Sequence, residues 1–167
     1  MTIDDVNALT PEDFKRRFGG LYEHSPWVAE SAAARRPFTD FEHMLAALNC
    51  VVEEAGATMQ LALLRAHPEL AGKAAIDRTL TDASAEEQAS AGLDRMTPEE
   101  FDRFQKLNAA YSARFDFPFI ICVRLVDKAG ILSAMESRGS NTREQEFKAA
   151  LDEVSKIVRL RLEAMRA

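Results

Sequence analysis

Two Thr-Pro-Glu sequences, each at the head of a stretch with helical character, constrain most strongly what this chain can fold into. They are Thr10-Pro11-Glu12-Asp13 and Thr97-Pro98-Glu99-Glu100. In each, the threonine can cap a helix, the proline fits the first helical position, and the acids favour the positive end of the helix dipole. After Thr97, apolar residues recur with a period of about 3.6 as far as Phe115. Both motifs therefore predict helix starts.

Two further stretches carry a similar pattern. Thr39 and Glu42 signal a helix start, and the apolar residues after them trace one helical face as far as His67. Asn141 and Glu144 open a last helix that continues to the end of the chain. A chain of 167 residues, 47% of them hydrophobic, can bury a core within one domain. We expect an all-α fold, with a single compact multi-helix domain over residues 1–167.

One segment, residues 119–126, departs from the helical pattern because it is rich in β-branched residues. As a single strand it would lack a ladder partner, so its backbone N–H and C=O groups would need other partners or could be offered to a ligand. Alternatively, it forms a helix after Pro118 whose core face happens to be β-branched. Either structure is compatible with an all-α fold.

Composition excludes several classes of function. The formal net charge is −6, from 27 acidic and 21 basic residues, and the basic residues form no stripe of the kind that binds nucleic acid. No apolar run approaches the roughly 20 residues of a membrane span, and the first residues do not resemble a secretion signal. Cys50 and Cys122 lie far apart in apolar contexts, as reduced thiols do in cytoplasmic proteins. We expect a cytoplasmic protein that binds neither nucleic acid nor a membrane.

His67 stands where the helix that starts near Thr39 has to end. Pro68 cannot donate the next backbone hydrogen bond, and it disfavours the α conformation of the residue before it. A titratable imidazole at the end of an element suits a pocket, although a lone histidine is more often packed or solvated than catalytic. His24 and His43 form no metal-binding pattern with it, so we expect no metal site.

The sequence Ser84-Ala85-Glu86-Glu87-Gln88 allows two interpretations. Ser84 and Glu87 have the spacing of a capping box, which by itself explains both residues at a helix start. The amides of the same helix start could instead bind an anionic or amide-bearing ligand, with a carboxylate that orients the ligand or a histidine.

Arg161 faces the predicted core. In a projection of the last helix at about 100° per residue, it falls about 40° from Phe147, inside the apolar stripe that includes Val154 and Val158. A buried guanidinium needs an acceptor, because an unpaired charge in the core is strongly unfavourable. Three explanations stay open: a salt bridge to an acid of the protein, a side chain that reaches solvent near a frayed helix end, or a clamp for a substrate carboxylate.

Taken in order, these motifs resemble one protein family. The residues that carry the resemblance are His67-Pro68-Glu69-Leu70, Ser84-x-x-Glu87-Gln88, Ala91-Gly92-Leu93, Asn108-x-x-Tyr111, Phe117-Pro118-Phe119-Ile120 and Arg138-x-x-Asn141. Their order and spacing are similar to those of the 2-oxo-4-hydroxy-4-carboxy-5-ureidoimidazoline (OHCU) decarboxylases, from about Leu9 to Leu162. Asp116 departs from the pattern, because relatives often have glycine there. The resemblance implies an all-helical fold, a homodimer and no cofactor.

The resemblance also implies site residues. His67 is similar to the catalytic histidine of the family, Glu87 to its carboxylate, and Arg161 to its anchoring arginine. Pro68 is similar to the substrate-binding neighbour of that histidine. The turn that holds the substrate in the family is similar to the run Ser84, Ala85, Glu86, Glu87 and Gln88. The segment whose backbone contacts the ring and ureido amides of the substrate resembles Phe119, Ile120, Ile121, Cys122 and Val123.

The activity implied is the loss of carbon dioxide from OHCU to give S-allantoin, the last step from urate. The adjacent ring unsaturation can absorb the electrons of the broken bond, so no pyridoxal or thiamine group is required. We expect Arg161 and backbone groups to fix this small-molecule substrate, Glu87 to orient His67, and His67 to act as the acid–base group. The alternatives are a non-catalytic helical binding or interaction domain, and a hydrolase of the same pathway that acts on 5-hydroxyisourate.

Overall fold

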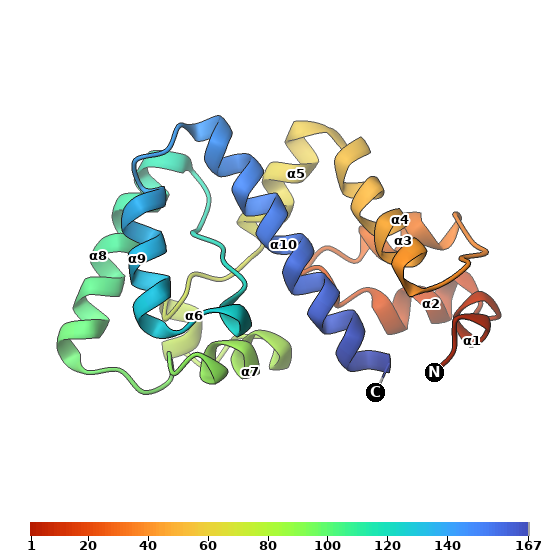
Figure 1. The fold of residues 1–167 in the computed structure, drawn as a ribbon, viewed down its shortest axis with the longest axis horizontal. Coiled ribbons are helices and arrows are strands. Elements are labelled where there is room, and N and C mark those ends of the chain that lie inside the picture. The colour runs from red at the N-terminus through yellow and green to blue at the C-terminus, as the bar shows by residue number, and fades with distance from the viewer. Residues whose placement is uncertain (167) are drawn as a thin grey trace. The chain divides into compact units, whose positions relative to one another are not determined.

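Helices form the regular structure of this protein. The computed structural model describes residues 1–166, with Ala74 described by its backbone only. The elements are α1 (Ile3–Asn7), α2 (Pro11–Phe18), α3 (Trp27–Ala33), α4 (Phe41–Glu54), α5 (Gly56–Arg65), α6 (Lys73–Ile76), α7 (Asp82–Ser90), α8 (Pro98–Phe115), the 3-10 helix η1 (Val123–Leu125), α9 (Lys128–Arg138) and α10 (Arg143–Arg166) (Figure 1). No strand occurs within residues 1–166, and the predicted all-α fold is confirmed.

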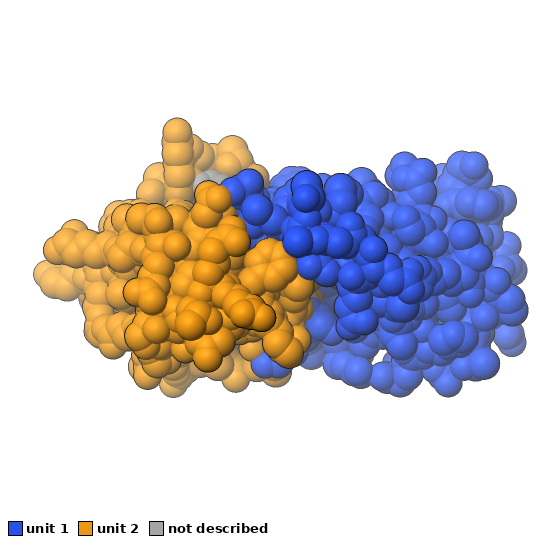
Figure 2. All heavy atoms as spheres, turned by 90° about the horizontal axis from the view of Figure 1, so that it is seen from above, with its two compact units in different colours: residues 1–66, 155–167 blue, residues 67–154 orange. Residues whose placement is uncertain are grey.

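The chain forms two compact units, which Figure 2 shows in different colours. Unit 1 consists of residues 1–66 and 155–167, and unit 2 consists of residues 67–154. α10 contributes its first part to unit 2 and its last part to unit 1. The single domain over residues 1–167 stays a prediction. His67 is the first residue of unit 2, so the motif around it belongs to the same unit as the segments that follow it.

In unit 1, α2 and α4 both pack against α3. Phe14 and Phe18 are fully buried, with ring centroids 4.8 Å apart. Met44 and Leu48 of α4 are also fully buried, on the helical face that the spacing of apolar residues predicted. The amphipathic pattern therefore identified the core face of this helix.

The core of unit 2 is an aromatic cluster built on α8. The ring centroid of Tyr111 lies 4.5 Å from that of Phe115, 6.0 Å from that of Phe117 and 5.2 Å from that of Phe119. All four residues are at most 3% exposed. Because Phe117 and Phe119 flank Pro118, their burial against α8 fixes the start of the segment that follows.

The two Thr-Pro-Glu motifs start helices, as predicted. The side chains of Thr10 and Thr97 accept hydrogen bonds from the backbone N–H groups of Asp13 and Glu100, at the starts of α2 and α8. At Thr97 the capping box is complete, because its own N–H donates to Glu100 Oε2 at 3.1 Å. Caps of this kind depend only on neighbours in the chain, so the sequence alone identifies them.

The stretch after Thr39 differs from the prediction in two ways. The N-cap of α4 is Asp40 in place of Thr39, because the Asp40 carboxylate accepts the N–H of His43 at 2.7 Å. The one helix predicted as far as His67 is two helices, α4 and α5. They separate at Gly56, whose φ of +80° is incompatible with a continuous α-helix and favours glycine.

The last helix also begins later than predicted. Thr142 and Gln145 exchange side-chain and backbone hydrogen bonds of 2.9 and 3.2 Å, and this pair takes the place of the predicted Asn141 and Glu144. None of the described helices, including this longest one, has both the length and the apolar character needed to cross a membrane.

Residues 119–126 form neither of the two predicted structures. The backbone is irregular as far as Cys122 and then makes the single turn η1. Side chains satisfy part of this backbone: Arg138 Nη1 donates to the C=O of Ile120 at 2.8 Å, and the N–H of Cys122 donates to Glu153 Oε2 at 2.7 Å. These side chains thus supply hydrogen-bond partners that a neighbouring strand would supply in a sheet.

Asp116 ends α8 in the left-handed conformation, with a φ of +66° and a ψ of +23°. Glycine adopts this conformation without a steric penalty, whereas other L residues lose about 1–2 kcal/mol, aspartate and asparagine less than most. The glycine implied at this position by the family resemblance therefore suits the observed turn, and aspartate is a workable substitute.

We expect Asp116→Gly to stabilise the protein by about 0.5–1 kcal/mol, because it relieves the left-handed strain at the end of α8. The melting temperature should then rise by roughly 1–4 °C, as followed by circular dichroism. Asp116→Ala is the matched control and should lower the melting temperature. A glycine variant that melts below the parent protein would contradict this account of the turn.

Candidate active site

His67 is buried, with 9% of its surface exposed. α5 ends at Arg65 and Ala66 is its C-cap, so the histidine directly follows a helix end, as the proline at position 68 predicted. The imidazole is therefore not a solvated surface group. It lies within unit 2, next to the loop formed by residues 69–72.

Side chains of α7 and α8 hold the loop that follows His67. Gln88 of α7 accepts a hydrogen bond from the N–H of Ala71 at 3.0 Å, and Asn108 of α8 donates to the C=O of Leu70 at 2.8 Å. Gln105, also on α8, donates to the C=O of Ala71 at 2.7 Å. Ala71 has a φ of +50°, and these hydrogen bonds stabilise that unfavourable conformation. The two helices thus determine the path of the chain beside His67.

We expect Asn108→Leu to destabilise the protein by about 1–3 kcal/mol, because the C=O of Leu70 would lose its donor inside the core. Asn108 is only 2% exposed, so water cannot easily replace the lost bond. Urea unfolding measures the change. Ala109→Leu, at an exposed position of the same helix, is the control and should be nearly neutral. Equal midpoints for the two variants would show that the loop does not depend on this bond.

α7 begins before Ser84, contrary to the capping-box interpretation. Thr81 is the N-cap, and its hydroxyl accepts the N–H of Ser84 at 3.3 Å. Ser84 therefore lies within the first turn, and the interpretation of Ser84 and Glu87 as a capping box was wrong. The reason is a competing cap: Thr81 offers the same hydroxyl chemistry three positions earlier in the chain.

Residues 84–88 divide between the two faces of α7. Ser84 and Gln88, one helical turn apart, are 5% and 6% exposed. Glu87 is half-buried beside them, whereas Ala85 and Glu86 are exposed. Of the two adjacent carboxylates, only that of Glu87 borders the buried face.

The segment 119–123 lies in the same unit, and α7 packs against η1 at its end. Phe119, Ile120, Cys122 and Val123 are buried, and Ile121 is half-buried. α7 therefore contacts both η1, where this segment ends, and the loop after the histidine. Residues 84–88 lie on α7 itself, and residues 67–68 and 119–123 belong to the same unit.

Arg161 belongs to unit 1, where it forms a buried ion pair. Its Nη1 lies 3.0 Å from Glu23 Oε2, and 3.4 and 3.3 Å from the carbonyl oxygens of Gly20 and Leu21. The side chains of Arg161 and Glu23 are 8% and 2% exposed. The inward direction predicted from the apolar stripe is observed, and an acid of the protein accepts the charge. A role for Arg161 in binding a substrate carboxylate stays a prediction.

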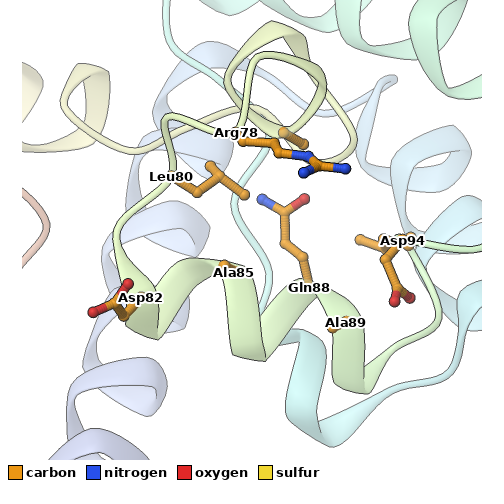
Figure 3. Close-up of a pocket in the computed structure, with 9 residues that line it drawn as sticks. Arg78, Leu80, Asp82, Ala85, Gln88, Ala89 and Asp94 are labelled. Carbon is orange, nitrogen blue, oxygen red and sulfur yellow. The ribbon is translucent and has the colours of Figure 1, made fainter.

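A pocket of about 370 Å³ lies along α7. Its lining consists of Ala75, Arg78, Leu80, Asp82, Ala85, Gln88, Ala89, Leu93 and Asp94. Figure 3 shows the side chains of Arg78 and Gln88 pointing toward one another across this space. Ala85 and Gln88 belong to the predicted site. Arg78 was not predicted, and nothing in the sequence distinguishes it from an ordinary loop arginine.

Tyr111 is a buried titratable group in the core of unit 2. Burial raises the pKa of the Tyr111 phenol, and the Glu146 carboxylate adds to the rise. Tyr111 is therefore a neutral hydroxyl at physiological pH. Over residues 1–166, no three His, Cys, Asp or Glu side chains gather as they do around a metal ion. That no metal takes part in the reaction stays a prediction.

Sequence reasoning gave no role to two polar residues near the site. Asn108 and Arg138 were noted only as parts of family motifs. In the projection that singled out Arg161, Asn108 falls about 40° from Phe104 on α8, and Arg138 about 20° from Ile131 on α9. Both lie within apolar stripes, so the same projection applied to these helices would have identified them.

Known proteins have similar sequences over nearly the full length of this chain. The chain matches the OHCU decarboxylase family over residues 7–163. It is 45% identical over 163 residues to the 2-oxo-4-hydroxy-4-carboxy-5-ureidoimidazoline decarboxylase of Haloferax volcanii, covering 97% of this chain and 94% of that protein. It is 37% identical over 161 residues to the uric acid degradation bifunctional protein of Bacillus subtilis, covering 96% of this chain and 32% of that longer protein.

Solved structures agree with the sequence relatives. The crystal structure of an (S)-allantoin synthase matches with a TM-score of 0.77 and 31% identity, over 99% of this chain and 54% of that chain. A second crystal structure, of an OHCU decarboxylase in the presence of (S)-allantoin, has a TM-score of 0.67 at 22% identity, over 83% of this chain and 89% of that chain, and shows a similar fold. Because the family match and the identity to the Haloferax protein extend over almost the entire sequence, this chain belongs to the OHCU decarboxylase family.

Proposed function

We propose that this protein is a carbon–carbon lyase that decarboxylates OHCU to S-allantoin during urate breakdown. The observation that carries the proposal is the 45% identity, across 97% of the chain, to an enzyme named for this reaction. The arrangement of unit 2 supports it, because α7, which carries residues 84–88, contacts both the loop after His67 and η1. A hydrolase of 5-hydroxyisourate has no comparable support.

The chemistry of the substrate is compatible with catalysis by side chains alone. The bond between the ring carbon and its carboxylate breaks, carbon dioxide leaves, and the electron pair moves into the adjacent ring unsaturation. A proton then adds to one face of the resulting intermediate. Since the ring itself accepts the electrons, the reaction requires no pyridoxal or thiamine group.

In this proposal His67 is the acid–base group, and its burial supports the role. An imidazole with 9% exposure meets little bulk water, which favours controlled delivery of a proton. Glu87, at the border of the buried face of α7, orients the histidine or the polar atoms of the substrate. Pro68 and residues 84–88 line the substrate, with the backbone of residues 119–123 facing its ring and ureido amides.

Arg161 anchors the substrate in the same proposal. The Glu23 carboxylate and two backbone carbonyls hold its Nη1 in one place, which preorganises the guanidinium. The negative charge of Glu23 also offsets part of the attraction that the guanidinium exerts on another carboxylate. Clamping of a carboxylate by this arginine is therefore compatible with the ion pair, and the two roles are separable by mutation.

The proposed protein is a cytoplasmic homodimer that binds neither nucleic acid nor a membrane. The net charge of −6 supports the expectation for nucleic acid, since a polyanion would be repelled. The homodimer rests on the family resemblance alone. Light scattering at several protein concentrations measures it, and a mass of one chain throughout would exclude a stable dimer.

Direct assay tests the proposed function. OHCU is generated freshly in the cuvette, and its ultraviolet absorbance is followed with and without the protein. We expect the protein to accelerate loss of the substrate far above the rate in buffer, in proportion to its concentration. Binding of allantoin with no acceleration would support the alternative, a helical binding domain without catalysis.

A further inference from the structure

Arg138, the last residue of α9, makes three kinds of contact with one guanidinium group. Its Nε lies 2.6 and 3.0 Å from the two carboxylate oxygens of Glu146, and its Nη1 donates to the C=O of Ile120 at 2.8 Å. The guanidinium also lies over the ring of Phe119, 4.4 Å from its centroid. The side chains of Glu146 and Arg138 are 0% and 15% exposed, so water competes little for these contacts.

Glu153 of α10 holds the same segment two residues further along. Its Oε2 accepts the N–H of Cys122 at 2.7 Å. Between the two held residues lies Ile121, which is half-buried. Among residues 1–166, no hydrogen bond is made by the backbone N–H or C=O of Ile121. The chain is therefore fixed on both sides of a residue whose backbone polar groups are available to a ligand.

The geometry around Arg138 requires an arginine. A lysine ammonium can pair with Glu146, but it lacks the planar fork that reaches a carboxylate and a carbonyl at once. It also lacks the flat surface that stacks on Phe119. Arg138→Lys thus keeps the charge of the buried pair while it removes the contacts that reach the segment.

We propose that Arg138 and Glu153 are positioning residues, which hold the backbone of Ile121 in the conformation that receives the polar groups of the substrate. Neither residue touches the reacting atoms. Their effect is on substrate affinity, because a mobile segment would have to be ordered each time a substrate binds. This inference rests on the proposed function and adds to it the device that preorganises the binding segment.

The test compares Arg138→Lys with Arg103→Lys. Arg103 of α8 is a suitable control because it pairs with Glu136, which lies on α9 as Arg138 does. This pair is on the surface, and half of the Arg103 side chain is exposed. For both variants and the parent protein, the measurements are melting temperature, kcat and KM with OHCU, and hydrogen–deuterium exchange of the peptide that spans residues 119–125.

For Arg138→Lys we expect a KM about tenfold higher and a kcat within about twofold of the parent, since a hydrogen bond from a charged donor is lost outside the reacting centre. Exchange in residues 119–125 should be about tenfold faster, while the rest of unit 2 is unchanged. Arg103→Lys should change none of these quantities. A wild-type KM with wild-type exchange, or activity that falls only with the folded fraction, would overturn the proposal.

Glu153→Gln provides a second variant with nearly the same shape, in case Arg138→Lys does not fold. It weakens the bond to the N–H of Cys122, and Asp152→Asn, a neighbouring exposed carboxylate, is its control. We expect the same rise in KM and in exchange, and their absence contradicts the inference. If the parent protein does not consume OHCU, the proposed function is wrong. If hydrogen–deuterium exchange of residues 119–125 is unchanged in both variants, the positioning role is wrong.

Discussion

His67→Ala should lower kcat for OHCU by about 10²–10⁴-fold, the usual contribution of a positioned acid–base group. The imidazole is buried at the start of unit 2, in a chain path fixed by hydrogen bonds from α7 and α8. Because those bonds do not involve the imidazole, the loop should keep its path when the side chain is shortened. Helix content from circular dichroism should therefore match that of the parent protein.

The control for this variant is His43→Gln. His43 is exposed at the start of α4. Its backbone N–H donates to the capping Asp40 carboxylate, and this bond does not require the imidazole. We expect wild-type kinetics from this variant. If His67→Ala formed S-allantoin at the parent rate, the acid–base role would be lost, and orientation by Glu87 and the backbone would have to account for the activity.

Arg161→Met should destabilise the protein by about 3–5 kcal/mol, because the Glu23 carboxylate would lose its guanidinium partner in the core of unit 1. The double variant Glu23→Leu with Arg161→Met should regain most of this loss, since an apolar pair of similar volume replaces a buried ion pair at little cost. Thermal and urea unfolding of the parent, the two single variants and the double variant measure the coupling.

The same set of variants separates the two roles of Arg161. If the arginine also clamps the substrate, the double variant will be stable and still show a KM at least about tenfold higher, as loss of a charge-assisted contact requires. A stable double variant with the KM of the parent protein would show that Arg161 has a structural role only. A single variant as stable as the parent would show that the ion pair contributes nothing.

The elements that the sequence predicted correctly depend on local chemistry. Thr10 and Thr97 cap helices because the acceptor and the donor are three residues apart in the chain, whatever the rest of the fold does. The capping box predicted at Ser84 was wrong for the same local reason, because Thr81 provides an equivalent cap three residues earlier. Gly56 interrupts a stretch whose apolar spacing is continuous, and spacing alone does not show a break.

The segment 119–126 could not be predicted because distant side chains determine its conformation. Its β-branched residues suggested a strand, but Arg138 and Glu153, from helices later in the chain, satisfy the backbone instead. For the site, Pro68 drew attention to His67, the resemblance implied the roles of His67 and Glu87, and the apolar stripe predicted the inward direction of Arg161. The hydrogen bonds of Gln88 and Asn108 that hold the loop after His67 follow only from the tertiary structure.

The handedness of the product tests the central claim most directly. In buffer, the planar intermediate takes up its proton on either face, so spontaneous decay gives both enantiomers of allantoin. In a site where one acid–base group serves one face, a single enantiomer forms. Circular dichroism of the reaction mixture, with OHCU generated in place, should show S-allantoin appearing with the protein and no net signal with buffer or with His67→Ala. Racemic allantoin formed at the buffer rate in the presence of the protein would contradict the account.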